Sequence, residues 1–260
     1  MIIVADFSKA KLVSYLKPGM KVKLDFRHGL GDCVMFMPLY LRLQELYPET
    51  TIHVAAASGN ELFGPVNAVE WYDLVAVLAF HETPGKPGML SKPEYCCLHE
   101  LGIPFDVSLN FTWKPAPKAN RLIGVNFMCN SNSNYNVPYR HAKVIWVALQ
   151  DRGLVPIEIY FRHKQYNCQN ERYDFVNCTT RGVVPSVDTF TSIMQTCTAF
   201  AGVNSGSLCM AMALYPERCL HLHTKYDLRY YNKNEVDTLD CRNNAMLDCK
   251  KLLDWIAKRL

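Results

Sequence analysis

The chain has 260 residues, of which 49% are hydrophobic and 20% are charged, so it can bury one large core or two small ones. Its 28 basic and 24 acidic residues give a formal net charge of +4, without any run of five or six lysines or arginines. This small excess would help an anionic ligand to approach. It does not single out nucleic acid or a membrane surface as the partner.

The amino-terminal segment is not typical of an exported protein. Residues 1–26 have a short apolar start followed by Asp and Lys, and they lack a signal peptide's long apolar stretch and cleavage site. No segment reaches the roughly 18 apolar residues that a membrane span needs. The 11 cysteines are irregularly spaced and several lie in apolar runs, which is typical of reduced, buried thiols. We therefore predict a cytoplasmic protein.

The first half of the chain is predicted to alternate strands and helices, which is typical of a parallel sheet with crossover helices. Strands are expected at 21–26, 51–56 and 74–79, and helices at 33–47, near 58–63 and at 94–101. Pro38 is placed in the early turns of its helix, where a kink costs least. The segment 81–92 is rich in Pro and Gly, so it is predicted to be a loop that could act as a lid or contact an acceptor.

A second alternating half follows an extended linker predicted at 111–121, which holds two prolines and three cationic side chains. Strands are expected at 122–127, 156–161, 199–203 and 218–223, and helices at 142–151, 187–197 and 207–214. The sequence therefore predicts an α/β protein with two Rossmann-like, doubly wound domains over 1–115 and 116–244. Residues 245–260 are expected to form an amphipathic helix that packs back at the domain junction.

The first candidate site is the turn at residues 27–32, RHGLGD, which follows the predicted strand at 21–26. Ligands bind at the carboxyl ends of strands in open sheets, and glycines let a ligand approach the backbone there. Asp32 could act as a general base that takes the proton from an acceptor hydroxyl. Spacing alone favours the simpler interpretation of Asp32 as a helix N-cap.

The second candidate site is the turn Asn204-Ser205-Gly206-Ser207, between the strand at 199–203 and the helix at 207–214. Its N–H and hydroxyl donors would stand at a helix amino terminus, a position suited to a diphosphate. A plain turn capped by a serine is equally compatible with these residues. If the two sheets face each other across a cleft, the two turns converge.

Other candidate groups carry weaker signals. Several basic residues flank strands and helices of the second half and could stabilise a leaving diphosphate. Exposed surface charge is the more common interpretation of such residues. They are Arg140, His141, Lys143, Arg162, His163 and Lys164. No CxxC pair or HExxH accompanies the cysteines and histidines, so no metal is expected. The GxGxxG, Walker and GxSxG motifs are also missing, which disfavours dehydrogenase, NTPase and hydrolase activities.

In order along nearly the whole chain, these residues resemble glycosyltransferase family 9, the ADP-heptose:lipopolysaccharide heptosyltransferases. Residues 27–38, RHGLGDCVMFMP, are similar to the family's R-x-G-x-L-G-D turn and following helix, with a contraction at His28-Gly29. Residues 95–103, YCCLHELGI, are similar to a helix ending in L-G-[IL], and 121–125, RLIGV, to the strand that opens the donor domain. Residues 189–214 resemble the stretch L-x-x-L-x-x-x-A-D-x-x-[IV]-x-x-D-[ST]-G-x-x-H-L-A-A-A.

Besides the contraction at His28-Gly29, the chain departs from the family pattern at three further places. Asn204 stands where the family has Asp, and Cys209 stands where it has His. Residues 130–139 lack the K-x-W-P pattern, so Arg140 or Lys143 could replace its lysine by position only. The substitutions at Asn204 and Cys209 put the donor's identity in doubt and leave open a loss of activity.

The resemblance implies the GT-B fold, two Rossmann-like domains facing a cleft, and metal-independent, inverting sugar transfer with Asp32 as base. It implies no cofactor beyond the nucleotide-sugar co-substrate. The resemblance places Asn204, Ser205 and Gly206 on the donor diphosphate. With the candidates named above, the predicted donor-binding residues are Asn204, Ser205, Gly206, Ser207, Arg140, Lys143 and Arg162, and the predicted acceptor-binding residues are Arg27, His28, Gly29 and Gly31. The acceptor would be lipopolysaccharide, another glycan, or a hydroxymethylated DNA base as in phage-encoded DNA glycosyltransferases. A nucleotide-sugar-binding module without catalysis is the alternative.

Overall fold

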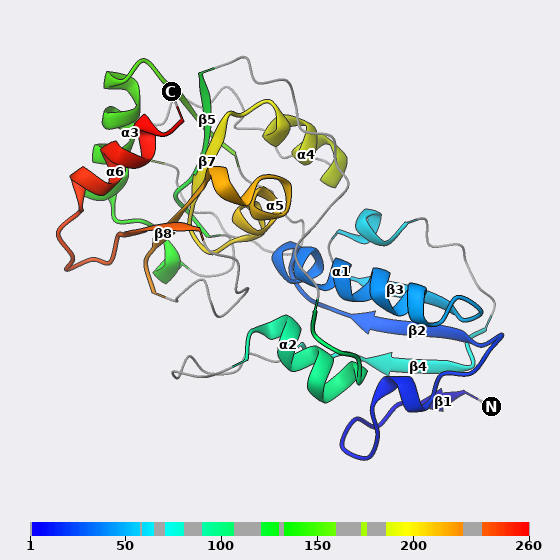
Figure 1. The fold of residues 1–260 in the computed structure, drawn as a ribbon. Coiled ribbons are helices and arrows are strands. Elements are labelled where there is room, and N and C mark those ends of the chain that lie inside the picture. Colours follow the sequence, from blue (N-terminus) through cyan, green and yellow to red (C-terminus); the bar gives the residue numbers. More distant parts are fainter. Residues whose placement is uncertain are drawn as a thin grey trace. The chain divides into compact units, whose positions relative to one another are not determined.

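The computed structural model describes residues 2–57, 59–64, 71–80, 90–106, 121–129, 133–159, 173–175, 186–225 and 236–259. These residues belong to two compact units, one within Met1–Asn110 and the other within Phe111–Leu228 and Asn234–Leu260 (Figure 1). Each unit holds one sheet whose strands all pair in parallel, which confirms the expected α/β class. Most of the linker expected at 111–121 and of the loop expected at 81–92 lies outside the described residues.

The sheet of the first unit has the strand order β1-β4-β2-β3. Its strands are β1 (Ile3–Val4), β2 (Lys21–Phe26), β3 (Thr51–Ala56) and β4 (Leu74–Val77). Side chains alternate between the two faces of a strand, and in β2 the apolar set Val22, Leu24 and Phe26 is fully buried while the residues between are not. One face of this sheet therefore packs into the core.

The principal helix of the first unit is α1 (Leu30–Leu46), which begins earlier than the sequence predicts. Gly29 is its N-cap, with an extended backbone at φ −71° and ψ 167°. Because the helix begins at Leu30, Pro38 lies in its interior, and the placement of Pro38 in the early turns is wrong. Shorter helical segments complete the unit: η1 (Leu12–Ser14), η2 (Asn60–Phe63), α2 (Lys92–Cys96) and the π-helical turn η3 (Cys97–Leu101).

The sheet of the second unit has the order β6-β5-β7-β8-β9. Its strands are β5 (Leu122–Asn126), β6 (Val155–Glu158), β7 (Ala199–Gly202), β8 (Cys219–His223) and β9 (Asp237–Asp240). The helices are α3 (Tyr139–Asp151), α4 (Val187–Gln195), α5 (Gly206–Leu214) and α6 (Cys249–Ala257), with short 3₁₀ turns η4 (Ser133–Tyr135) and η5 (Pro216–Arg218). Every residue of β7 is buried, as in a parallel sheet covered on both faces.

The carboxyl-terminal helix α6 completes the core of the second unit. Its buried residues Leu252, Trp255 and Ile256 belong to the same apolar cluster as Trp146 of α3 and Leu239 of β9. Figure 1 shows α6 beside α3. The amphipathic helix expected near the end of the chain is therefore observed, and its buried face packs within this unit. Within the described ranges, no helix is both long enough and apolar enough to cross a membrane.

The described cysteines are free thiols, and all of them except Cys249 are buried. Burial raises the pKa of the thiols of Cys97, Cys197 and Cys241 to about 12. Since the thiolate is the nucleophile, these thiols should react slowly in the folded protein. We expect iodoacetamide at pH 8 to modify Cys249 at least about tenfold faster than these three, as followed by peptide mass spectrometry. Equal rates in the native protein would contradict this burial, and equal rates in denaturant are the control.

Candidate functional site

Asp32 lies in the first turn of α1 and forms an ion pair with Lys92 of α2. Nζ of Lys92 donates a hydrogen bond of 2.7 Å to Oδ1 of Asp32, and the two side chains are 5% and 19% exposed, respectively. Within the described ranges, Oδ2 of Asp32 carries no hydrogen bond. Because Gly29 is the N-cap, the interpretation of Asp32 as the cap is wrong. The carboxylate is held through one oxygen at the carboxyl end of β2.

Lys92 is positioned by a capping box at the start of α2. Ser91 is the N-cap, and its side chain accepts from the backbone N–H of Glu94 at 3.5 Å. In return, Oε2 of Glu94 accepts from the backbone N–H of Ser91 at 2.7 Å. The S-x-x-E pattern of 91–94 is a known sign of a helix start. It could have placed Lys92 at the first helical position, but it carries no information on the contact between Lys92 and Asp32.

Phe80 and Glu100 shape the backbone next to this ion pair. Phe80 is buried with φ at 42°, a conformation that bulky residues rarely adopt. The buried Glu100 carboxylate holds it there, because it accepts the backbone N–H of Ala79 at 2.7 Å and that of Phe80 at 3.1 Å. The Phe80 ring lies 5.9 Å from Nζ of Lys92. Strained backbone of this kind is concentrated at functional sites, so we add Phe80 to the predicted site residues.

The predicted acceptor residues flank Asp32 and differ in their surroundings. The Arg27 side chain is 79% exposed and pairs with Asp25 at 2.9 Å. Nε2 of His28 lies 3.0 Å from the carbonyl oxygen of Leu78, at the end of β4. Gly29 leaves open space where a side chain would begin, and Gly31 lies within the first turn of α1. The turn therefore has the exposure at Arg27 and the open space at Gly29 that a ligand would require.

The second candidate turn, 204–207, opens α5 in the second unit. Ser205 is the N-cap, and its Oγ accepts the backbone N–H of Leu208 at 3.4 Å and donates to Oδ1 of the buried Asn126 at 3.0 Å. Ser207 is buried, while Asn204 and Gly206 are partly exposed. The simple interpretation of a serine-capped turn is confirmed. A capped helix amino terminus is also a favourable place for an anion, so the cap is compatible with a diphosphate site, which stays a prediction.

Replacing Ser205 by alanine should separate these two roles. We expect the loss of the cap in Ser205→Ala to lower the free energy of unfolding by about 1 kcal/mol. Ser186 is a matched control because it caps α4 in the same way, accepting from Thr189 N–H at 3.1 Å. Ser186→Ala should cost a similar amount in urea titrations. Only Ser205→Ala should also weaken nucleotide binding, and equal nucleotide affinity in both variants would argue against a donor site at this turn.

The predicted donor cations lie around the amino terminus of α3. Arg140 donates a hydrogen bond to the carbonyl oxygen of Asn243, and the exposed Lys143 lies 5.7 Å from the ring of Tyr139. Arg162 lies outside the described residues, so its role stays a prediction. Arg140 and Lys143 thus lie in the first turns of α3, and Arg140 contacts the segment after β9.

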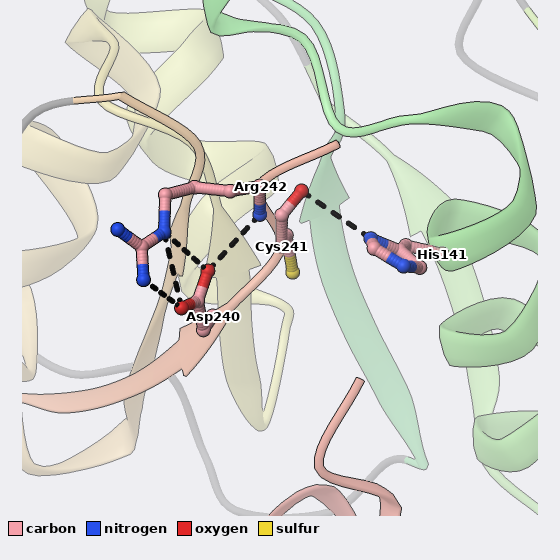
Figure 2. Close-up of polar contacts among 4 residues, drawn as sticks. All are labelled: His141, Asp240, Cys241 and Arg242. Atoms are coloured by element: carbon pink, nitrogen blue, oxygen red, sulfur yellow. Dashed lines mark hydrogen bonds and ion pairs between the residues drawn. The ribbon is translucent and has the colours of Figure 1, made fainter. Parts of the chain in front are cut away.

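Figure 2 shows the contacts at the carboxyl end of β9, one of which reaches α3. Nδ1 of His141 lies 3.3 Å from the carbonyl oxygen of Cys241. Nε of Arg242 donates to both oxygens of Asp240, at 3.0 and 3.1 Å. Hydrogen bonding to Arg242 lowers the pKa of the Asp240 carboxyl below its usual value. The segment after β9 is therefore held against α3 by the His141 side chain, while the Arg242–Asp240 pair fixes the turn within that segment.

Metal ligation finds no candidate in the part of the chain that the structure describes. There, no three His, Cys, Asp or Glu side chains are grouped so that they could hold an ion. His221 and His223 do meet, with ring centroids 5.6 Å apart, and Cys96 and Cys97 are both buried.

No protein-family model matches the chain, and no curated protein matches it. Solved structures do match. The ADP-heptose LPS heptosyltransferase II of E. coli has 14% identity and a TM-score of 0.63, over 92% of this chain and 98% of that chain. The iron-containing dodecameric glycosyltransferase TibC of enterotoxigenic E. coli has 11% identity and a TM-score of 0.63, over 92% and 68% of the two chains.

A third match is a glycosyl transferase family 9 protein from Veillonella parvula, with 10% identity, a TM-score of 0.54 and 84% coverage of each chain. At such identities the likeness concerns the fold, and it extends over most of the chain. The resemblance to family 9 is confirmed at that level: this chain has the fold of the heptosyltransferase-like glycosyltransferases.

Proposed function

We propose that this protein is a nucleotide-sugar-dependent glycosyltransferase that transfers a sugar to an acceptor hydroxyl. The observation that carries the proposal is the Asp32 carboxylate, held at the carboxyl end of β2 by the buried Lys92. The matched structures are glycosyltransferases, which supports the same reaction class. The proposal includes the GT-B arrangement, in which the two units face a cleft, and a cytoplasmic location.

In the proposed mechanism, Asp32 is the general base. Its Oδ2 accepts the acceptor's hydroxyl proton as the acceptor oxygen forms a bond to the anomeric carbon of the sugar. The bond from that carbon to the phosphate oxygen breaks, and the nucleoside diphosphate leaves with the electron pair. Attack on the face opposite the leaving group inverts the anomeric configuration. Metal-independent transfer requires the protein itself to stabilise the charge that develops on the diphosphate.

The second unit would supply that stabilisation. The amino terminus of α5 presents backbone N–H groups after the Ser205 cap, and the helix dipole favours an anion there. Asn204 precedes the cap, and its amide brings no negative charge toward a diphosphate. We assign the donor diphosphate to the turn at 204–207, with Arg140, Lys143 and Arg162 as its cationic partners. Arg27, His28, Gly29 and Gly31 would contact the acceptor.

The acceptor is proposed to be either a hydroxymethylated DNA base or a hydroxyl of lipopolysaccharide or another glycan. A base acceptor would have to leave the base stack before Asp32 could reach its hydroxyl. The departures at Asn204 and Cys209 favour a second candidate function, in which the protein binds a nucleotide sugar without transferring it.

The test begins with a thermal-shift panel of ADP, UDP, GDP and CMP and their sugars. A ligand that binds only the folded state raises its stability by mass action, by about 2.7 kcal/mol at 100 times its Kd. The stabilising nucleotide sugar is then incubated with hydroxymethylated DNA and, separately, with lipopolysaccharide core, and the products are analysed by mass spectrometry. Stabilisation without transfer to either acceptor would support the binding module. If no donor stabilised the protein, both sugar transfer and nucleotide-sugar binding would be excluded.

A further inference from the structure

Among the residues that the structure describes, those on one face of the first sheet are partly exposed. Sheets of parallel strands are usually buried on both faces, as β7 is in the second unit. In the first unit, β2 alternates strictly between buried and partly exposed residues, and β4 leaves Val77 57% exposed. The strand register places Lys23 beside both His53 and Val75. These three residues share the partly exposed face.

Aromatic and basic side chains gather at the amino ends of the strands on this face. Nζ of Lys21 lies 4.1 Å from the centroid of the Trp71 ring. Nδ1 of His53 lies 3.3 Å from the hydroxyl of Tyr72, and these two rings meet edge to face at 83°. Trp71 is 56% exposed, which is unusual for so large an apolar side chain. We name Lys21, Lys23, His53, Trp71 and Tyr72 the sheet platform.

Carboxylates near the sheet platform already have partners. Asp25 lies on the same face as Lys23 and receives both Nε and Nη2 of Arg27, at 3.0 and 2.9 Å. Oδ2 of Asp73 accepts the backbone N–H of Lys21 at 2.8 Å. Lys23 makes no ion pair within the described ranges, and Lys21 rests on an aromatic ring rather than on an acid. The platform therefore offers two cations beside two aromatic rings.

We propose that the sheet platform binds single-stranded nucleic acid. Bases stack on exposed aromatic rings, and lysines beside those rings neutralise the phosphates between the bases. A cation lying on an indole ring, as Lys21 does, combines both contacts at one position. Aromatic residues are common in protein–protein interfaces as well, but lysine is depleted there, so the two lysines favour nucleic acid over a protein partner.

The platform is separate from the candidate sugar-transfer site on this unit. Lys21, Thr51 and Leu74 begin their strands, whereas Asp32 follows the carboxyl end of β2. The inference does not depend on sugar transfer, since binding can be measured without a donor. Should transfer to DNA also be found, the platform would hold the strand on which the modified base lies.

The test is a fluorescence-anisotropy titration of labelled oligothymidine, 20 nucleotides long, with the full-length protein at several salt concentrations. We expect Trp71→Ala to weaken binding at least about fivefold, the low end of what one lost base stack costs. Lys23→Ala should weaken binding and lower the salt slope by roughly one lost phosphate contact. Lys250→Ala is the matched control, because Lys250 is an exposed lysine on α6 of the second unit and should bind as the parent does.

Three results would overturn the inference. The first is the absence of binding at low salt in the parent protein. The second is binding that Trp71→Ala and Lys23→Ala leave at the parent's affinity while their thermal unfolding stays unchanged. The third is competition by heparin or by anionic lipid vesicles as strong as that of unlabelled oligothymidine, which would mean charge recognition without base stacking.

Discussion

Replacing Asp32 by asparagine should abolish most of the sugar transfer while leaving nucleotide binding intact. An asparagine side chain keeps the shape but cannot take a proton, and positioned general bases contribute about 10²- to 10⁴-fold to rate. We expect kcat to fall by that factor, measured as initial rates of product formation. The dissociation constant of the nucleotide should stay within about twofold, because the assigned donor residues lie in the other unit.

A drop in activity could also arise from misfolding, because Asp32→Asn removes the negative charge 2.7 Å from the buried Lys92 ammonium. The double variant Asp32→Asn with Lys92→Met removes both charges and so separates misfolding from loss of the base. It should unfold near the parent's urea midpoint and still be inactive. Asp254→Asn, at an exposed pair with Lys250, is the control for a lost surface carboxylate and should keep full activity. A parental kcat in Asp32→Asn would exclude the base assignment.

Strands with clear periodicity could be predicted from the sequence. The segments 21–26 and 51–56 are strands at the predicted residues. In β2, apolar and polar side chains alternate because one face of the strand is buried and the other is not. The sequence also predicts the helices in the right places, but with shifted ends. The start of α1 depends on the extended backbone of Gly29, and a glycine in a turn gives no signal of whether it caps a helix.

Long-range pairing explains what the sequence could not show. β9 has one buried residue, Leu239, so its pattern is too weak to identify it, and it is a strand because it pairs with β8. In the candidate site, Asp32 was found through its turn. Its partner Lys92 lies 60 residues further along the chain. No local pattern relates two residues that tertiary folding alone brings together.

The Lys92–Asp32 ion pair should also have a measurable effect on stability, with unequal costs for its two members. The Lys92 side chain is more deeply buried than that of Asp32, at 5% against 19% exposure. Removing the carboxylate leaves a cation that water reaches poorly, and breaking buried pairs in this way costs about 3 kcal/mol or more. Removing the ammonium in Lys92→Met leaves a carboxylate that water can still reach, so we expect about 2 kcal/mol.

Urea titrations of both single variants and the double variant form a cycle that measures the coupling directly. A buried pair replaced by uncharged side chains of similar size is often close to neutral, so the double variant should lie within about 1 kcal/mol of the parent. Lys92→Arg should recover part of the stability by keeping the charge. If the two single costs simply added in the double variant, the pair would contribute no coupling, and Lys92 could not be the group that holds the Asp32 carboxylate in place.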